Sequence, residues 1–441
     1  MYKTTCIILK NKDAILCNYC DNFTSLAKSF KNAVIFRCRQ LLFAKSKNYS
    51  NLNVNEMQVL SEFKHTEDKY KAISNTYYLP SFYHFDYMFK VMHNSDYYNT
   101  LPMQTTQAII KECLSDFKAY FKAMKSYFKN KSLFKAKPKV PNYIKNSRTS
   151  FDITNQDAVI KDGLLKLPKI KQKLNLGLLK LSKLKEVVIK PFYDTYKICI
   201  VTENKDLDND SSLDYSKILG IDIGVNNFIT TSNNCGLAPF IINGKIMKSY
   251  NQFYNKRVAK LKSLLPEFIY NSKMINNLSK NRFNYFNDKM HKISNYVIKY
   301  CLNNNIGTIV VGKNNSWKDK SNMSCKNNQH FCYIPHSNFI NKLREKALNY
   351  HIKLIEREES YTSKCSFLDK DFIYTFNKDD FNVQFSGKRV KRGLYKSKNG
   401  LFVNADVNAA SNIIRKEFAN AFDNILDFNY MIKTVIRVNI V

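Results

Sequence analysis

Apolar residues recur along the chain at two different spacings, which predict helices in some segments and strands in others. Residues 101–128 have large apolar residues three and four apart, with lysines on the other face: Ile110, Leu114, Phe117, Phe121, Met124 and Phe128. This spacing predicts an amphipathic helix whose apolar stripe packs into a core. Two prolines, Pro138 and Pro141, follow it and end the helical pattern.

Two other stretches of the first 200 residues favour strands. Residues 1–50 mix short apolar runs, such as TTCIILK and NAVIFRC, with polar turns, which predicts a β-rich segment. Residues 151–201 also read as strands, and lysines alternate with apolar positions over 161–190. This alternation predicts a strand face or rim that follows a phosphate backbone, with a merely solvated face as the alternative. The polar, acidic stretch 204–216 predicts a linker.

The pattern changes after the linker. KILGIDIG, NNFITTS and PFIING predict three strands, and a long helical stretch covers about 250–304. IGTIVVG at 306–312 predicts a buried strand. A helix near 337–350 leads into a strand, HIKLIER, and a last helix starts near NADVNAASNIIRK. A strand meander followed by a parallel strand with helices is the order of an RNase H-like domain, so we predict a mixed α/β fold.

The charge of the chain indicates a polyanionic partner. The 441 residues are enough for two to four domains. Lys and Arg number 70 against 36 Asp and Glu, a net charge of +34. Nucleic acid is the usual partner of such a surface; acidic lipid and a Lys-rich composition from an AT-rich genome are the alternatives. No stretch approaches the roughly 18 apolar residues of a membrane span, so we expect no membrane partner.

Cysteine usage favours a reducing, cytoplasmic compartment. The chain has 11 cysteines, an odd number without framework spacing. The start, MYKTTCIILKNKD, is too short and too quickly charged for a secretory signal. The close pair Cys17 and Cys20 has no second pair downstream to complete a zinc site, so we interpret both as ordinary apolar residues.

Two acids are candidates for metal chemistry. Asp222 ends an apolar strand in GIDIGVNN, where an acid needs a metal or a hydrogen-bond donor. Gly220 and Gly224 flank it, and glycine lets a metal or phosphate approach the backbone. An acid that caps the turn is one alternative. The first phosphate loop of an actin-like ATPase is another, although we find no further glycine-rich loop among the 11 glycines.

The second acid, Asp406, lies near a helix N-terminus in NADVNAASNI, where either Asn404 or Asp406 is also suited to cap the helix. RNase H-like nucleases need two or three carboxylates around two divalent ions about 4 Å apart. One acid on the first strand and one on the last helix match that requirement.

Five motifs in order resemble the TnpB family of bacterial insertion sequences, which is related to Fanzor proteins and type V CRISPR effectors: GIDIGVNN, IGTIVVGKN, EESYTSKCS, SGKRVKRGLYKSKNG and NADVNAASNI. The resemblance is sharp over 216–416 and fainter before. It implies an RNA-guided DNA endonuclease, encoded by a transposable element, that pairs a guide RNA with a double-stranded DNA target beside a short flanking motif. It further implies RuvC-type cleavage with two Mg²⁺ or Mn²⁺ ions and a bacterial, nucleoid-associated protein, monomeric or dimeric.

The resemblance also implies a domain order, with a RuvC domain preceded by a β-rich wedge-like domain that contains a helical insertion. The expected parts are a wedge part (1–50), a helical recognition insertion (51–145), wedge strands (146–203), the linker (204–216), the RuvC domain (217–360), a zinc-ribbon-like insert (361–403) and a C-terminal helix and tail (404–441).

By resemblance, Asp222 matches the first RuvC acid and Asp406 the third. The second position departs from the family pattern, because Gly312 stands where many relatives have Glu. We expect Glu359, or else Glu358, to supply the missing ligand from the end of the next strand. Two surface acids are the alternative, and a nuclease-inactive RNA-guided repressor is the corresponding rival function. A DDE-type transposase is a more distant rival.

The zinc-ribbon-like insert departs as well. Relatives have two Cys-x-x-Cys pairs in this interval, whereas this chain has Cys365 and no His. We therefore expect no structural zinc and a metal-free hairpin. Grouped with Tyr395, the cations of this hairpin are expected to contact nucleic-acid phosphates, with a merely solvated loop as the alternative: Lys388, Arg389, Lys391, Arg392, Lys396 and Lys398.

Overall fold

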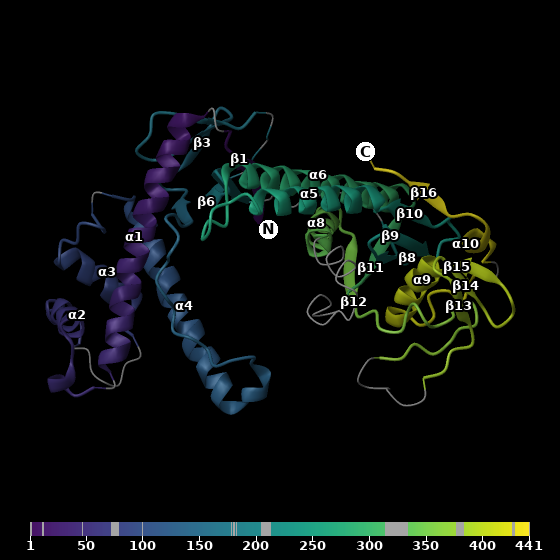
Figure 1. Ribbon diagram of the computed structural model, residues 1–441, viewed down its shortest axis with the longest axis horizontal. Coiled ribbons are helices and arrows are strands. Elements are labelled where there is room, and N and C mark those ends of the chain that lie inside the picture. Colours follow the sequence, from purple (N-terminus) through teal and green to yellow (C-terminus); the bar gives the residue numbers. More distant parts are fainter. Residues whose placement is uncertain are drawn as a thin grey trace. The chain divides into compact units, whose positions relative to one another are not determined.

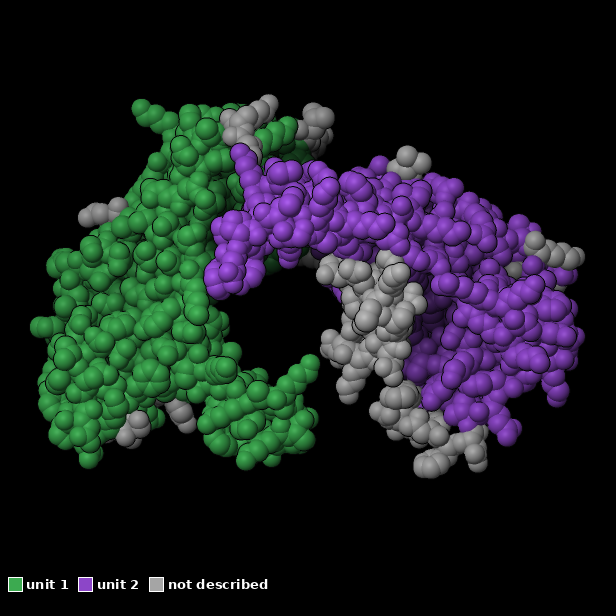
Figure 2. Space-filling model, in the orientation of Figure 1, with its two compact units in different colours: residues 1–206 green, residues 207–441 purple. Residues whose placement is uncertain are grey.

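The computed structural model describes residues 2–10, 13–45, 47–71, 79–98, 100–177, 179, 181, 183–203, 213–313, 334–375, 383–425 and 428–440. The chain divides into two compact units, residues 1–206 and 207–441, which Figure 2 colours separately. Most of the predicted linker, residues 204–212, lies outside the described residues, and residues 214–216 belong to strand β8 (Asp214–Ile223). None of the described helices combines the length and apolar content needed to span a bilayer.

The first unit contains the predicted amphipathic helix. Helix α4 (Met103–Lys129) confirms the prediction over 101–128. Its apolar stripe is buried at Ile110, Leu114 and Phe117, whereas Phe128 in the last turn is 66% exposed. The stripe therefore packs into a core over only the first part of the helix. Other helices of this unit are α2 (Val54–Lys64), α3 (Phe82–Val91) and the short η1 (Tyr49–Asn51) and η2 (Lys131–Leu133).

The prediction of a β-rich segment over residues 1–50 is wrong for most of that range. Strand β1 (Tyr2–Ile8) is followed by α1 (Ala14–Ala44), a long helix drawn in purple in Figure 1. The apparent short runs are turns of one helical stripe, because the buried residues are three and four apart: Leu16, Cys20, Phe23, Ala27, Phe30, Val34, Cys38 and Leu41.

The strands of the first unit form an antiparallel sheet in the order β1-β7-β6-β2. Strands β2 (Phe151–Thr154), β6 (Leu184–Phe192) and β7 (Thr195–Glu203) come from the region predicted as strands. Strand β1 comes from the other end of the unit and pairs with β7. A separate small sheet joins β3 (Val159–Lys161), β4 (Leu164–Lys166) and β5 (Leu174–Asn175).

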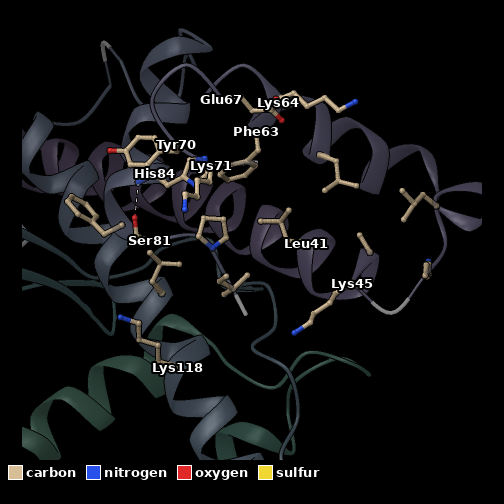
Figure 3. Close-up of a pocket in the computed structure, with 18 of the residues that line it drawn as sticks. Leu41, Lys45, Phe63, Lys64, Glu67, Tyr70, Lys71, Ser81, His84 and Lys118 are labelled. Carbon is tan, nitrogen blue, oxygen red and sulfur yellow. Dashed lines mark hydrogen bonds between the residues drawn. The ribbon is translucent and has the colours of Figure 1, made fainter. Parts of the chain in front are cut away.

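Helices of the first unit surround a cavity of about 880 Å³. Apolar residues such as Leu41 and Phe63 line it together with Lys45, Lys64 and Lys118 (Figure 3). The acids that are candidate metal ligands belong to the second unit. This cavity therefore plays no part in the site described below.

The second unit has a sheet in the order β12-β11-β8-β9-β10-β16. Strands β8, β9 (Asn227–Asn233) and β10 (Phe240–Asn243) form an antiparallel meander. Strand β11 (Ile306–Gly312) then pairs in parallel with β8, and β12 (Lys353–Arg357) pairs in parallel with β11. This order confirms the predicted RNase H-like α/β fold. Strand β16 (Ile436–Val438), parallel to β10, was not predicted.

Helices cover both faces of this sheet. The predicted helical stretch 250–304 is two helices, α5 (Lys245–Lys262) and α6 (Lys273–Asn303). Further helices in the described part of this unit are α8 (His336–Asn349), α9 (Ala405–Glu417) and the short α10 (Asn429–Lys433). Leu219 and Ile221 of β8 lie in a core with α6 and α8, whereas Ile218 lies in a second core with α9. Figure 1 shows α9 beside the sheet strands.

Side chains alternate between the two faces of a strand. Asp222 is therefore on the same face of β8 as Ile218, the face that α9 covers. Val310 of β11 lies in the same core as Ile218, which puts Gly312 on this face as well. Strands β13 (Lys388–Lys391), β14 (Leu394–Lys396) and β15 (Phe402–Asn404) form a small antiparallel sheet that leads into α9.

Candidate active site

The candidate acids follow the ends of neighbouring parallel strands. Asp222 is the penultimate residue of β8, Gly312 ends β11, and Glu358 and Glu359 come directly after β12. In the register, Val311 pairs with both Ile221 and Glu356. Parallel strands end at the same edge of a sheet, and β11 lies between β8 and β12. The acids at residues 222 and 358–359 therefore lie at one edge.

Helix α9 supplies the remaining acid. The side chain of Asn404 accepts hydrogen bonds from the backbone N–H groups of Asp406 (3.0 Å) and Val407 (3.3 Å), so Asn404 is the N-cap. The carboxylate of Asp406 is left for other partners. Asn227 Nδ2 donates to Asp406 Oδ2 at 2.7 Å. Since Asn227 starts β9, directly after the β8 turn, this bond holds Asp406 at the end of β8 that contains Asp222.

The glycines beside Asp222 have a different role from the one expected. A Cβ on Gly220 would lie 2.6 Å from the Ala410 carbonyl oxygen in α9, and a Cβ on Gly224 would lie 2.5 Å from that of Asn227. The interpretation that these glycines leave room for a metal or phosphate is therefore wrong. The chain itself occupies the space, and Gly220 lets α9 approach β8 closely.

Glu359 occupies the space in front of Gly312. A Cβ on Gly312 would lie 2.5 Å from Glu359 Oε2, 3.3 Å from Glu359 Cβ and 2.6 Å from Ile413 Cδ1 of α9. The carboxylate of Glu359 thus lies where a side chain on residue 312 would begin. An acid that directly follows β12 thus stands beside the end of β11.

Glu358 is placed differently. Its carboxylate accepts hydrogen bonds from the Ser360 N–H and from Lys416 Nζ, both at 2.6 Å. Burial opposes its ionisation, but the bonds from Lys416 and Ser360 outweigh burial and hold the pKa of Glu358 below its usual range. The Lys416 side chain is only 5% exposed, so this ion pair fastens the end of β12 to α9. Of the two glutamates, Glu359 is the one that faces Gly312 and Asp222.

Electrostatics show that Asp222, Glu359 and Asp406 share one environment. Burial raises the pKa of Asp222 well above its usual range, and repulsion from Glu359 and Asp406 adds to this, against attraction by Arg389. Burial, then repulsion from Glu358, raises the pKa of Glu359 to about 7, with Lys416 acting in the opposite direction. Acids in such surroundings are common at functional sites.

The donor set fits a hard divalent cation, since carboxylate oxygens are the ligands that Mg²⁺ and Mn²⁺ prefer. Across the described residues, however, no group of three or more His, Cys, Asp or Glu side chains is already arranged to hold a metal ion. At Asp406, a cationic side chain is in place instead. Arg389 donates to Asp406 Oδ1 at 3.1 Å and to the Arg392 carbonyl oxygen.

The predicted cations of the hairpin are exposed, and Arg389 alone of the six has a described bond to one of the candidate acids: Lys388, Arg389, Lys391, Arg392, Lys396 and Lys398. Tyr395 was grouped with them as a residue able to contact nucleic acid, and this interpretation is wrong. Its side chain is 1% exposed and its hydroxyl donates to the Lys364 carbonyl oxygen at 2.8 Å. Tyr395 is a core residue of the insert.

Hydrogen bonds to one carboxylate connect three segments of the insert. Asp369 Oδ2 accepts from Ser366 Oγ (2.5 Å), Ser386 Oγ (3.0 Å) and the Lys398 N–H (2.8 Å). We call this group the Asp369 cluster. Cys365 is buried, and burial raises the pKa of its thiol to about 11. Residues widely separated in the insert are thus joined through one carboxylate.

Sequence reasoning missed three asparagines that position this site. Besides Asn227, both Asn408 and Asn412 of α9 donate to the Cys365 carbonyl oxygen at 2.8 Å. Residues four apart lie on the same face of a helix, so this spacing within NADVNAASNI was a usable signal. The pair fastens the start of the insert to α9, next to Asp406.

Two family models match the second half of the chain. Residues 201–318 match the OrfB_IS605 family, described as a probable transposase, and residues 336–413 match the Cas12f1-like TNB domain. No curated protein sequence matches the chain significantly.

Distant likenesses to solved structures also occur. A Cas12f1–sgRNA–target DNA complex has 15% identity over 95% of this chain and 100% of that one, with a TM-score of 0.34. The mini-RNA-guided endonuclease CRISPR-Cas phi3 has 10% identity over 94% and 92%, with a TM-score of 0.42. C2c1 of Alicyclobacillus acidoterrestris with single-guide RNA has 10% identity over 92% and 32%, with a TM-score of 0.26. The two family-model matches, which follow one another along residues 201–413, support a member of the TnpB family.

Proposed function

We propose that this protein is an RNA-guided DNA endonuclease of RuvC type, and that Asp222, Glu359 and Asp406 bind two Mg²⁺ or Mn²⁺ ions. The observation that supports it most directly is the convergence of these three acids at one edge of an RNase H-like sheet. Ions bound there would activate a water molecule and stabilise the leaving oxygen of a phosphodiester.

The neighbouring residues then have separate tasks. Asn227 holds Asp406 through its 2.7 Å hydrogen bond, so that this carboxylate faces the same edge as Asp222. Glu358 fastens β12 to Lys416 and leaves Glu359 as the ligand. Arg389 balances the charge of Asp406 in the metal-free protein, and a divalent ion competes with it for that carboxylate.

The partners that we propose are a guide RNA and a double-stranded DNA target. The net charge of +34 and the exposed cations of the hairpin support a polyanionic partner. Guide pairing would supply sequence specificity, and the protein would hold the heteroduplex by shape and charge and contact a short flanking motif. Lys388, Lys391, Arg392, Lys396 and Lys398 are the phosphate contacts that we propose, with Arg389 between the phosphates and the site.

The proposal includes the domain roles and the setting. Residues 1–50 and 146–203, with the β1-β7-β6-β2 sheet, would be the wedge-like part, residues 51–145 the recognition insertion, and residues 361–403 the target-binding insert. The protein would act as a monomer or dimer in the bacterial cytoplasm at the nucleoid. Gly312 favours a second candidate, a nuclease-inactive RNA-guided repressor, because it removes the usual acid from β11.

The test has two stages. Sequencing RNA that co-purifies with the protein is expected to give one discrete species, whereas random RNA would leave a general RNA-binding protein. The protein–RNA complex is then incubated with matched plasmid and Mg²⁺. We expect cleavage by the wild type and by Glu358→Gln, and binding without cleavage by Glu359→Gln. Binding without cleavage by the wild type, with either Mg²⁺ or Mn²⁺, would establish the repressor.

A further inference from the structure

Two cysteines far apart in the sequence face each other across an antiparallel strand pair. Cys6 of β1 is directly opposite Cys199 of β7 in the register. Their sulfur atoms are 2.8 Å apart, although 193 positions separate the residues along the chain. This is close for two thiols, which makes the pair a candidate for covalent bonding.

The backbone geometry at this position suits a disulfide. Leu9 donates its N–H to the Tyr196 carbonyl oxygen at 2.9 Å, which makes these two residues a hydrogen-bonded pair. Hydrogen-bonded and non-hydrogen-bonded pairs alternate along antiparallel strands. Three steps back, Cys6 and Cys199 are therefore a non-hydrogen-bonded pair, in which Cα atoms are about 4.5 Å apart. Disulfides bridge Cα separations from about 4.4 to 6.8 Å.

The two thiols differ in accessibility and charge surroundings. Cys6 is exposed, whereas Cys199 is buried. Lys197 on β7 and Lys190, its partner on β6, lie near the pair. The hydrogen bond between the two thiols, then the two lysines, lower the pKa of Cys6 to about 6 against the effect of burial, and the same bond raises the pKa of Cys199. Cys6 is placed to react first and Cys199 to follow.

We propose that Cys6 and Cys199 form a reversible thiol–disulfide switch that is closed by a small disulfide such as glutathione disulfide. The Cys6 thiolate attacks one sulfur of that disulfide, forms a mixed disulfide and releases one glutathione thiolate. Cys199 loses its proton to solvent and attacks the Cys6 sulfur, which releases the second glutathione. Two protein thiols are oxidised by two electrons, and one disulfide is reduced to two thiols.

The bond would act on the attachment of the first strand. In the described sheet, β1 is one of the two edge strands and pairs with β7. Closing the switch ties β1 to β7 covalently and joins the two ends of the first unit through a long loop, which restricts the unfolded chain. Because Cys6 is exposed, the bond is accessible to a reductant and should be readily reduced.

The test uses the full chain in glutathione buffers of stepped reduced-to-oxidised ratio. Peptide mapping by mass spectrometry is expected to find a Cys6–Cys199 cross-link, and thermal unfolding of the oxidised protein is expected to shift upward and to return with dithiothreitol. Cys6→Ser should abolish both effects; because Cys6 is exposed, this variant is expected to fold.

Cys17→Ser is the matched control, since Cys17 is the other cysteine of the first unit that is not fully buried. It should leave the cross-link and the shift unchanged. Three outcomes would overturn the proposal: glutathione retained on Cys6 with no internal bond, a Cys17–Cys20 bond in its place, or thiols that stay reduced throughout.

Discussion

The carboxylate of Glu359 lies against the backbone of Gly312, 2.5 Å from the point where a Cβ on residue 312 would stand. The two residues are therefore complementary. An acid that directly follows β12 needs a residue without a side chain at the end of β11. The absence of an acid at 312 and the presence of one at 359 are two parts of a single packing arrangement.

Gly312→Ala should disturb this arrangement. The added methyl group would overlap Glu359 and the side chain of Ile413, so we expect a loss of about 1–3 kcal/mol in the free energy of unfolding and a fall in cleavage. Gly393→Ala is the control, because nothing lies within 4 Å of a Cβ there. Urea unfolding and plasmid cleavage measure the two effects, and an equal response from both variants would contradict the account.

Glu359 should make the metal-free protein less stable as the pH rises. Its pKa is raised in the folded chain from the ordinary 4.5 to about 7, so the unfolded chain loses this proton first. The free energy of unfolding should therefore fall between pH 4.5 and 7, by an amount on the order of 3 kcal/mol, and level off above pH 7.

Glu359→Gln removes this titration and should be more stable than the wild type near pH 8. Denaturant unfolding in EDTA across this pH range measures both proteins, with Glu358→Gln as the matched variant. Parallel curves for the wild type and Glu359→Gln would contradict a raised pKa of Glu359.

Arg389→Ala should strengthen binding of a divalent ion to the protein without nucleic acid. The guanidinium competes for Asp406 and is itself 42% exposed, so its removal is worth about a two- to fivefold increase in Mn²⁺ affinity. Calorimetric titration gives the affinity directly. Lys391→Ala, an exposed cation of the same hairpin, should leave it unchanged, and a weaker affinity in Arg389→Ala would disprove competition.

The Asp369 cluster should be a main source of stability in the insert. Asp369→Ala leaves three donors without their shared acceptor, which should cost about 2 kcal/mol or more. Asp423→Ala, which removes an exposed ion pair with Lys370, should cost less than about 1 kcal/mol. Unfolding free energies compare the two, and a larger loss in Asp423→Ala would contradict the assignment.

The RNase H-like unit was more predictable than the first unit, for a physical reason. Its strands are continuous apolar runs, such as 306–312, so local sequence indicates them directly. Helix α1 was missed because its stripe is interrupted by polar residues and was divided into apparent strands. The pairings of β1 with β7 and of β10 with β16 join distant segments, and nothing local marks them.

The candidate site shows the same division. Motif order led to Asp222, Asp406 and the 358–359 pair. The choice between the two adjacent glutamates, however, depends on which one forms the ion pair with Lys416. The role of Gly220 depends on the approach of α9, and the burial of Tyr395 depends on the packing of the insert. Such contacts arise only once distant segments are folded together.

Strand β16 changes how the main sheet meets its surroundings. Strand β10 is almost wholly buried and apolar. If its outer backbone N–H and C=O groups were unpaired, they would form a template for pairing with a strand of another chain. Because β16 pairs in parallel with β10, the edge of the described sheet is a shorter strand. This strand has an exposed residue, Arg437, at its centre. A short edge strand with a cationic side chain is a poor template for strand pairing. This arrangement therefore disfavours edge-to-edge self-association.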